Sequence, residues 1–325
     1  MPSKDWQPCA SWQAMQERAD MQRCIRAFFA SRGVLEVETP LLARAGVTDV
    51  HLHNATTRLQ GPGMPTPTDF YLQTSPEYAM KRMLAAGSGA IFQLCKVVRD
   101  DEISRRHNPE FTLLEWYRPG FDDLQLMAEL DELMQVLLQA MPAQTITYQD
   151  AFLQCIGVDP LASNSKPAVL DALNTAGFGD AVSIDDHLDT LLQLAMSMLV
   201  EPKLGQERPC FVSHFPASQA ALARIDKDDA RVSRRFELFY QGLELANGFW
   251  ELTDAQQQRA RFVADNAKRV ASGLSQQPID EAFLAALEHG LPDCSGVAVG
   301  VDRLLMLKLG TRDIADVLAF PVQRA

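Results

Sequence analysis

The segment spanning residues 91–117 constrains the fold most. It contains two apolar, strand-like runs, IFQLCKVVR at 91–99 and EFTLLEWY at 110–117, on either side of a polar loop at 100–108. Two strands joined by such a loop predict an antiparallel pair. The fold class then depends on what the rest of the chain adds to this pair.

Helical patterns occupy the start and the middle of the chain. Apolar residues recur at helical spacing over residues 11–31, and residues 122–200 are mostly helical in pattern. We therefore expect a mostly helical insertion over approximately residues 120–205. The proline- and glycine-rich stretch at 61–69 predicts a surface loop.

Strand patterns return in the second half of the chain. They lie at residues 210–215 and 236–250, and a glycine-punctuated strand at 295–300 precedes a helix at 301–309. Strands at both ends around a helical middle predict an α+β fold with one mainly antiparallel sheet flanked by helices. We expect a single domain over residues 1–325.

The charge balance argues against a polyanionic partner. The chain has 30 Lys and Arg against 42 Asp and Glu, a net charge of −12, and no run of four basic residues. Proteins that bind nucleic acid usually present a basic face, because neutralising phosphates dominates such binding. We therefore expect no stable tRNA binding.

Other broad features indicate a cytoplasmic protein without membrane segments. The longest apolar run, residues 191–200, is about half of what a membrane span needs. The first ten residues lack the apolar core of a secretory signal. The six cysteines form no CxxC pair, and we interpret them as reduced thiols.

The loop between the first two strands has the chemistry of a nucleotide site. Arg99 can bind a phosphate with its two-pronged guanidinium, carboxylate and backbone groups can read a base, and Phe111 can stack on that base. The alternative is a charged hairpin loop in water, which is the commoner meaning of an isolated charge cluster.

Three glutamates stand in apolar strands further along the chain. Glu237, Glu244 and Glu251 belong to FELFYQGLELANGFWEL, where a buried carboxylate is unfavourable unless it meets a cation. Mg²⁺ or a substrate amine would serve. The alternative is simple alternation on a half-exposed strand. Because the glutamates are seven residues apart, a turn or bulge at Gly242 or Gly248 must intervene.

The last motif is GVAVGVDR at residues 296–303. Its small residues allow close approach of a ligand to the backbone, and Arg303 in the first helical turn can reach a phosphate. Tight strand-to-helix packing explains the glycines equally well. His51 and His53 have no third ligand nearby, and no P-loop or dinucleotide fingerprint is present.

Taken together, these segments resemble the catalytic core of class II aminoacyl-tRNA synthetases, most closely the lysyl branch. The resemblance covers nearly the whole chain in the family's order and spacing. It runs from Arg18 through SPE (75–77), RDDEISRRHNPEFTLLEWY (99–117), ELANGFWEL (244–252) and GVAVGVDRLLML (296–307).

The resemblance implies an ATP-dependent ligase that forms an aminoacyl-adenylate and acts as a homodimer. It places Arg99 on the α-phosphate and Arg303 on the γ-phosphate as the catalytic residues, and Mg²⁺ on Glu237 and Glu244. The implied ATP-binding residues are Arg99, Asp100, Asp101, Asn108, Phe111, Glu244, Leu245, Gly300 and Arg303. The implied amino-acid-binding residues are Ser75, Pro76, Glu77, Tyr117, Asn247, Glu251 and Ala298.

Three departures from the synthetase pattern redirect the expected acceptor. Only about 15 residues precede the match, so we expect no anticodon-binding domain. Ser75 and Ala298 resemble freestanding paralogs that attach β-lysine to a lysine side chain of elongation factor P. Asp101 stands where the family has Glu, with Glu102 as a possible substitute. A methyl-sized change such as Ala298 alters discrimination by about 1–3 kcal/mol.

Two alternatives stay open at this point. One is a minimal lysyl-tRNA synthetase-like enzyme that charges RNA. The other is a non-catalytic regulatory paralog, against which the intact Arg99, Glu237, Glu244 and Arg303 count.

Overall fold

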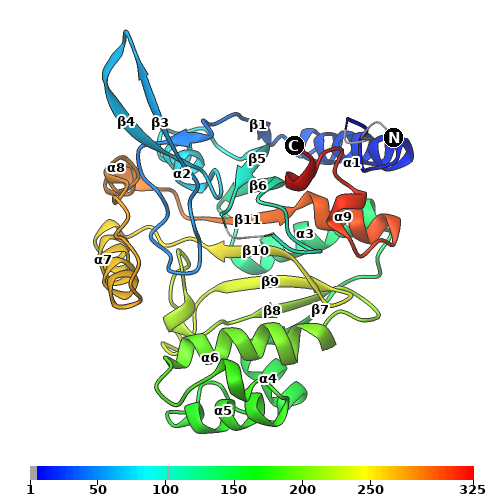
Figure 1. Cartoon of the computed structure of the whole chain (residues 1–325), viewed down its shortest axis with the longest axis vertical. Helices are drawn as coiled ribbons and strands as arrows, with labels where there is room; N and C mark the ends of the chain where they lie inside the picture. Colours follow the sequence, from blue (N-terminus) through cyan, green and yellow to red (C-terminus); the bar gives the residue numbers. More distant parts are fainter. Residues whose placement is uncertain (1–5, 101–102) are drawn as a thin grey trace. The chain divides into compact units, whose positions relative to one another are not determined.

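The computed structural model describes residues 6–100 and 103–325. This part of the chain forms two compact units (Figure 1). Unit 1 comprises Met1–Gly120, Thr253–Cys294 and Ala298–Ala325, and unit 2 comprises Phe121–Leu252 and Ser295–Val297. Within the described residues, no helix combines the length and apolar character needed to cross a bilayer.

The strand pair expected from the sequence forms the centre of unit 1. β5 (Ile91–Val98) and β6 (Glu110–Pro119) are antiparallel over their full length, from Ile91 opposite Tyr117 to Val98 opposite Glu110. β1 (Leu35–Glu36) pairs with β5 in parallel, and β11 (Cys294–Gly300) follows β6 in the strand order. The predicted antiparallel pair is confirmed.

Helix α1 (Trp12–Ala30) covers one face of this pair. Ser11 caps it, with Ser11 Oγ accepting from Ala14 N at 3.1 Å. Phe29 stacks on Phe92 with 4.6 Å between ring centroids and lies 5.2 Å from Trp116. The opposite face of the pair therefore carries the alternate residues, which include the polar groups described below.

A second sheet in unit 1 corrects the loop predicted at 61–69. Its strand order is β2 (Leu42–Ala43), β4 (Met64–Leu72), β3 (Thr56–Gly61). β3 and β4 form a hairpin, so most of the expected loop is strand. Proline is tolerated there because β2 pairs only with Tyr71 and Leu72, which leaves one edge of β4 open at Pro65 and Pro67.

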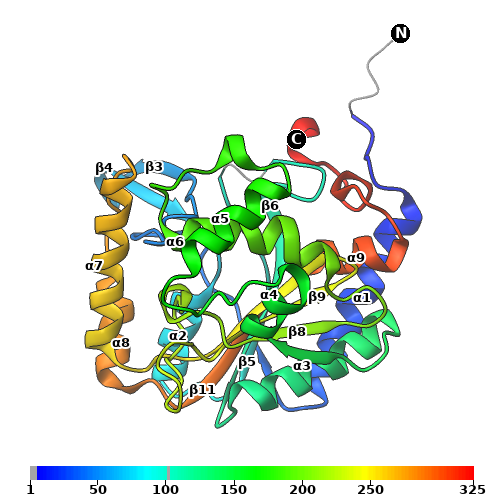
Figure 2. The same ribbon diagram turned by 90° about the horizontal axis from the view of Figure 1, so that it is seen from below.

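The remaining helices of unit 1 come from distant parts of the chain. α7 packs on α8, and α8 packs on α2 (Figure 2). Tyr78 of α2 stacks on Phe283 of α8 with 4.7 Å between ring centroids. These elements, with the last helix of the chain, are α2 (Glu77–Ala85), α7 (Ala255–Ala271), α8 (Glu281–Gly290) and α9 (Val301–Leu309).

Unit 2 combines the second half of the sheet with a group of helices. Its strand order is β11, β10 (Leu243–Trp250), β9 (Arg235–Tyr240), β8 (Cys210–Ser213) and β7 (Gln144–Thr147), with β7–β8 parallel and β8–β9 and β9–β10 antiparallel. The helices are α3 (Asp123–Leu138), α4 (Tyr148–Ile156), α5 (Ser165–Thr175) and α6 (Leu188–Ala195).

An apolar cluster joins α4, α5 and α6 to the strands of unit 2. Tyr148 and Phe152 of α4 stack on each other with 4.6 Å between ring centroids, and Val212 and Phe239 belong to the same cluster. Figures 1 and 2 show α4, α5 and α6 grouped together. Apart from the three-stranded sheet, the strands of the described residues belong to a mostly antiparallel eight-stranded sheet, which confirms the predicted α+β class.

The turn between β9 and β10 lies at Gln241 and Gly242, which have φ values of 51° and 68°. The expected turn at Gly242 is confirmed. A register shift falls between Glu244 and Ala246 rather than at Gly248. At Gly248 a Cβ would lie 2.3 Å from the Phe236 ring, so glycine there permits the close approach of an aromatic side chain.

Candidate functional site

Arg99 follows the last residue of β5, where the strand pair opens into its loop. Its backbone N–H donates to Pro109 O at 2.8 Å. The guanidinium lies 5.0 Å from the centroid of the Phe111 ring, and Nε donates to Thr74 O at 3.3 Å. Two residues predicted to hold the nucleotide are therefore neighbours, a cation beside an aromatic face.

The other predicted loop residues fall in different places. Asp100 is exposed, and its N–H donates to His53 O at 2.9 Å. Asp101 lies outside the described residues. Asn108 is buried; its Nδ2 donates to Glu110 O at 2.6 Å and its Oδ1 accepts from Val322 N at 2.9 Å. In this state Asn108 holds the C-terminal segment, and its adenine contact stays a prediction.

Arg303 lies in the first turn of α9, three residues after Gly300. Its Nη2 lies 2.7 Å from Nε2 of His107, and His107 Nδ1 lies 2.7 Å from Ser104 Oγ. Because arginine can only donate, His107 Nε2 must accept, which leaves the proton on Nδ1 facing Ser104. Sequence reasoning assigned no role to His107, although it stands in the charged loop that drew attention.

A buried ion pair fixes the helix that carries Arg303. Asp302 is 2% exposed; it accepts from Arg18 Nη2 and from Thr112 N, the latter at 2.6 Å. Arg18 Nη2 also donates to Val317 O at 2.7 Å. The first turn of α9 is thereby attached to α1 and to β6, so the backbone position of Arg303 is set by two other elements.

A second group of polar side chains, which we call the Glu115 cluster, lies between α2 and β6. It comprises Ser75, Glu77, Lys81, Glu115 and Tyr117. Ser75 Oγ accepts from Glu77 N at 3.1 Å and donates to Glu115 Oε2 at 2.6 Å. Tyr117 Oη donates to Glu115 Oε1 at 2.7 Å, and Lys81 Nζ donates to Glu77 Oε1 at 2.5 Å.

Glu115 is a buried carboxyl group with a raised pKa. It is 2% exposed, and burial, reinforced by the charge of Glu77, raises its pKa to about 7. Hydrogen bonds from Ser75 and Tyr117 and the charge of Lys81 oppose this rise. Near neutral pH the carboxyl is thus poised between two protonation states, and a cation placed beside it would favour the ionised one.

Glu115 and Lys81 were not predicted as site residues. A signal was present for Glu115, because it stands two residues before Tyr117 in a strand and must share its face. No comparable signal exists for Lys81, which is 1% exposed in a helix that reads as ordinary. Its Nζ lies 6.0 Å from the Tyr117 ring and 5.8 Å from the Phe283 ring, two residues that only the fold brings beside it.

The remaining predicted residues of unit 1 have less specific positions. Pro76 occupies the N-cap position of α2 without a side-chain hydrogen bond. On β11, half-buried Ala298 and Gly300 alternate with buried Val297 and Val299. Ala298 and Gly300 therefore share the more accessible face of that strand.

In unit 2, β9 and β10 bring three of the predicted residues onto one face. Glu237 stands directly opposite Asn247, and Glu244 stands opposite Phe239, which is on the same side of β9 as Glu237. The register shift between Glu244 and Ala246, at buried Leu245, makes this possible. The carboxylates of Glu237 and Glu244 can therefore act together.

The electrostatics of Glu237 suit a cation. Burial raises its pKa to about 7, Arg235 opposes that rise and Glu244 adds to it, while Arg235 Nη2 donates to Glu237 Oε1 at 2.5 Å. Asn247 Oδ1 is buried and has no hydrogen-bond partner among the described residues. Glu251 is 1% exposed, and Arg224 donates to its carbonyl oxygen at 2.9 and 3.1 Å.

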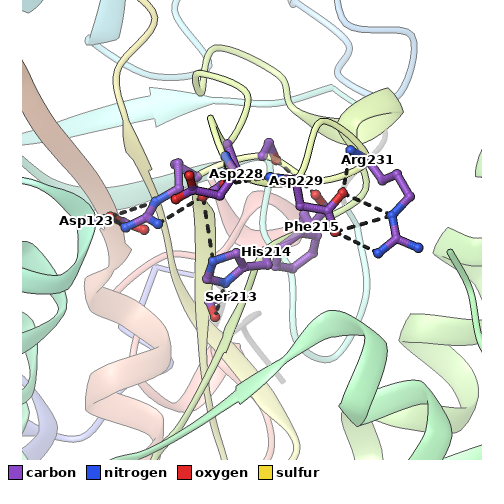
Figure 3. Close-up of polar contacts among 10 residues, drawn as sticks. Asp123, Ser213, His214, Phe215, Asp228, Asp229 and Arg231 are labelled. Atoms are coloured by element: carbon purple, nitrogen blue, oxygen red, sulfur yellow. Dashed lines mark hydrogen bonds and ion pairs between the residues drawn. The ribbon is translucent and has the colours of Figure 1, made fainter.

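A cavity of about 330 Å³ also lies in unit 2, away from the predicted residues. Its lining includes His214, Asp226 and Arg234. Arg234 Nη1 donates to Asp226 at 3.0 Å, and Arg234 Nη2 donates to Asp123 at 2.5 Å. Figure 3 shows the polar contacts of this region, with Asp123, His214 and Asp229 labelled. Burial opposes ionisation of Asp226, but the Asp228 N–H and Arg234 outweigh it and lower the pKa. This network holds the segment that leads into β9.

Comparison with known proteins agrees with the geometry. A family model described as "tRNA synthetases class II (D, K and N)" matches residues 8–324. The chain is 55% identical over 320 residues to "Elongation factor P--(R)-beta-lysine ligase" of Pseudoalteromonas translucida and 54% identical to the protein of that name from Salmonella typhi, covering 98% of each chain. The predicted resemblance is confirmed: the chain belongs to the class II tRNA synthetase family.

Proposed function

We propose that this ligase activates (R)-β-lysine with ATP and transfers it to a lysine side chain of elongation factor P. The observation that carries this proposal is the 55% identity, over 98% of both chains, to a relative whose name states that activity. The Glu115 cluster supports it independently, because the buried Glu115 and the half-buried Glu77 are two carboxylates that suit a substrate with amino groups.

The first half-reaction needs no general base. The substrate carboxylate is already ionised at neutral pH, and it attacks the α-phosphorus of ATP with departure of pyrophosphate. Arg99 neutralises charge on the α-phosphate, Phe111 stacks on adenine, and Arg303 binds the γ-phosphate. Asp100, Asn108, Leu245 and Gly300 complete the proposed ATP contacts.

The acidic pair of unit 2 fits Mg²⁺. Glu244 raises the pKa of Glu237, a repulsion that a cation between the two carboxylates would relieve. No group of three or more His, Cys, Asp or Glu suited to a metal occurs in residues 6–100 and 103–325. Glu237 and Glu244 would hold the ion, which would supply positive charge against the triphosphate.

Acidic and polar side chains are the proposed contacts of the amino-acid substrate. In unit 1, Glu77, Glu115 and Tyr117 would receive its ammonium groups, with Ser75 holding Glu115 in place. In unit 2, the buried Asn247 Oδ1 offers a further acceptor. Pro76, Glu251 and Ala298 are the remaining proposed contacts.

In the second half-reaction the neutral ε-amine of the acceptor lysine attacks the carbonyl carbon of the adenylate. The new bond is an amide, AMP leaves with the electron pair of the broken C–O bond, and the amine loses one proton. The acidic charge of −12 supports a protein acceptor rather than stable tRNA binding. We further propose a cytoplasmic homodimer, in which α1 and β1 would meet the partner through the exposed Trp12 and Leu35.

Amino-acid-dependent exchange of labelled pyrophosphate into ATP tests the activation step. We expect exchange with (R)-β-lysine at a kcat/KM at least tenfold above that with α-lysine, because moving an amino group by one carbon changes binding by about 1–3 kcal/mol. Exchange with neither isomer, or a preference for α-lysine, would contradict the proposed substrate.

A further inference from the structure

Gln93 occupies a position on β5 directly opposite Glu115 on β6. Directly opposed residues of an antiparallel pair project from the same face with Cβ atoms about 4.5–5.5 Å apart. Phe92 and Trp116 face the other way, against Phe29 of α1. Gln93 therefore stands beside the Glu115 cluster and not in the apolar core under α1.

The Gln93 side chain is buried with an unused acceptor. It is 3% exposed, and its Oε1 has no hydrogen-bond partner among the residues that the structure describes. The side chain also hydrogen-bonds Cys95, two residues along the same strand. A buried amide oxygen left without a donor costs about 1–3 kcal/mol, and a donor brought by a ligand beside Glu115 would relieve that cost.

The neighbouring groups define what that donor would be. The two oxygens of Glu115 already accept hydrogen bonds from the hydroxyl groups of Ser75 and Tyr117. An ammonium group has three N–H donors. The neutral amide of Gln93 supplies an acceptor for one of them without placing a second negative charge opposite Glu115. A carboxylate at position 93 would instead repel Glu115 across the strands.

We propose that Gln93 is a specificity-determining residue whose amide oxygen accepts a hydrogen bond from the distal ammonium of the amino-acid substrate, beside Glu115. The distal group is assigned here because Gln93 and Glu115 are 3% and 2% exposed, whereas the Glu77 side chain is 16% exposed. The deeper end receives the group farthest from the reacting carboxylate. This inference rests on the proposed activation of β-lysine.

The test compares Gln93→Leu with wild type in pyrophosphate exchange, using two inhibitors that each keep one amine. 6-Aminohexanoic acid keeps the distal amine, and (R)-3-aminohexanoic acid keeps the proximal one. We expect Gln93→Leu to raise the β-lysine KM and the Ki of 6-aminohexanoic acid by roughly 5- to 100-fold. The Ki of (R)-3-aminohexanoic acid and the ATP KM should stay within about twofold of wild type.

Gln258→Leu is the matched control. Gln258, on α7, is 1% exposed and likewise has a buried Oε1 without a hydrogen-bond partner in the described part of the chain. It should leave every KM and Ki unchanged. If Gln93→Leu does not fold, as judged by thermal unfolding, the unbranched Gln93→Met replaces it.

Two failures can be told apart. An unchanged β-lysine KM, or equal rises in Ki for both inhibitors, would overturn the role of Gln93 while leaving the proposed function standing. Wild-type protein that shows no β-lysine-dependent exchange would overturn the proposed function, and the role of Gln93 with it.

Discussion

Replacing Arg303 with alanine is expected to reduce pyrophosphate exchange by about 10³-fold or more while leaving the fold intact. A positioned arginine on a transferring phosphoryl group contributes on that scale, because its charge acts where negative charge develops. Arg303 is half-buried, and its Nη2 lies 2.7 Å from His107 Nε2. Exchange rate and melting temperature are the two measurements.

The control for this change is Arg312→Ala, which removes an exposed arginine three residues after the end of α9. It should leave exchange within about twofold of wild type. Normal exchange in Arg303→Ala would mean that this arginine does not bind the γ-phosphate. Loss of the buried Asp302 carboxylate is expected to lower the melting temperature. If Arg303→Ala lowered it as much, Arg303 would have a structural role instead.

Replacing Glu115 with glutamine should raise the KM for β-lysine roughly 30- to 1,000-fold with little change in the ATP KM. Removing one partner of a buried charge pair costs about 2–4 kcal/mol. Glutamine keeps the size of the side chain and can still accept from Ser75 or Tyr117. The loss therefore reports the missing charge rather than a cavity, and an unchanged β-lysine KM would remove Glu115 from the substrate site.

The same variant has a distinctive dependence on pH. The folded-state pKa of Glu115, about 7, lies above its ordinary 4.5, so its contribution to stability is fully present below 4.5 and is lost as pH rises through 7. Between pH 5 and pH 8, we expect the free energy of unfolding of Glu115→Gln to rise relative to that of wild type by on the order of 1–3 kcal/mol. Wild type is expected to show a rise in β-lysine kcat/KM as pH rises through 7, and Glu115→Gln should lack this rise. Urea unfolding at both pH values checks the first expectation, and an identical shift in both proteins would contradict it.

The strand pair and the arginines were predictable because their signals are local. Period-two alternation around a polar loop indicates β5 and β6, and Arg99 and Arg303 each stand at the junction of a strand with a loop or helix. Residues 61–69, most of which belong to the β3–β4 hairpin, were predicted to be a loop because of their proline and glycine content. Whether proline fits depends on which strand edge lacks a neighbour, and tertiary structure decides that.

The Glu115 cluster shows where sequence reasoning ends. Glu77 and Tyr117 were predicted as site residues. Lys81 and the neighbouring Gln93 were not, because only burial and cross-strand position distinguish them. Gln93 reads as an unremarkable residue in IFQLCKVV until its register places it opposite Glu115. Asn108 shows the reverse case: a residue chosen for chemistry engages the C-terminal segment in this structure.

One labelling measurement shows directly which molecule accepts the activated β-lysine. The protein is incubated with labelled (R)-β-lysine and ATP, together with purified elongation factor P, with the same factor lacking its acceptor lysine, or with total tRNA. We expect label on intact elongation factor P, and none on the factor lacking its acceptor lysine or on tRNA. Label on tRNA, with none on the protein, would contradict this expectation.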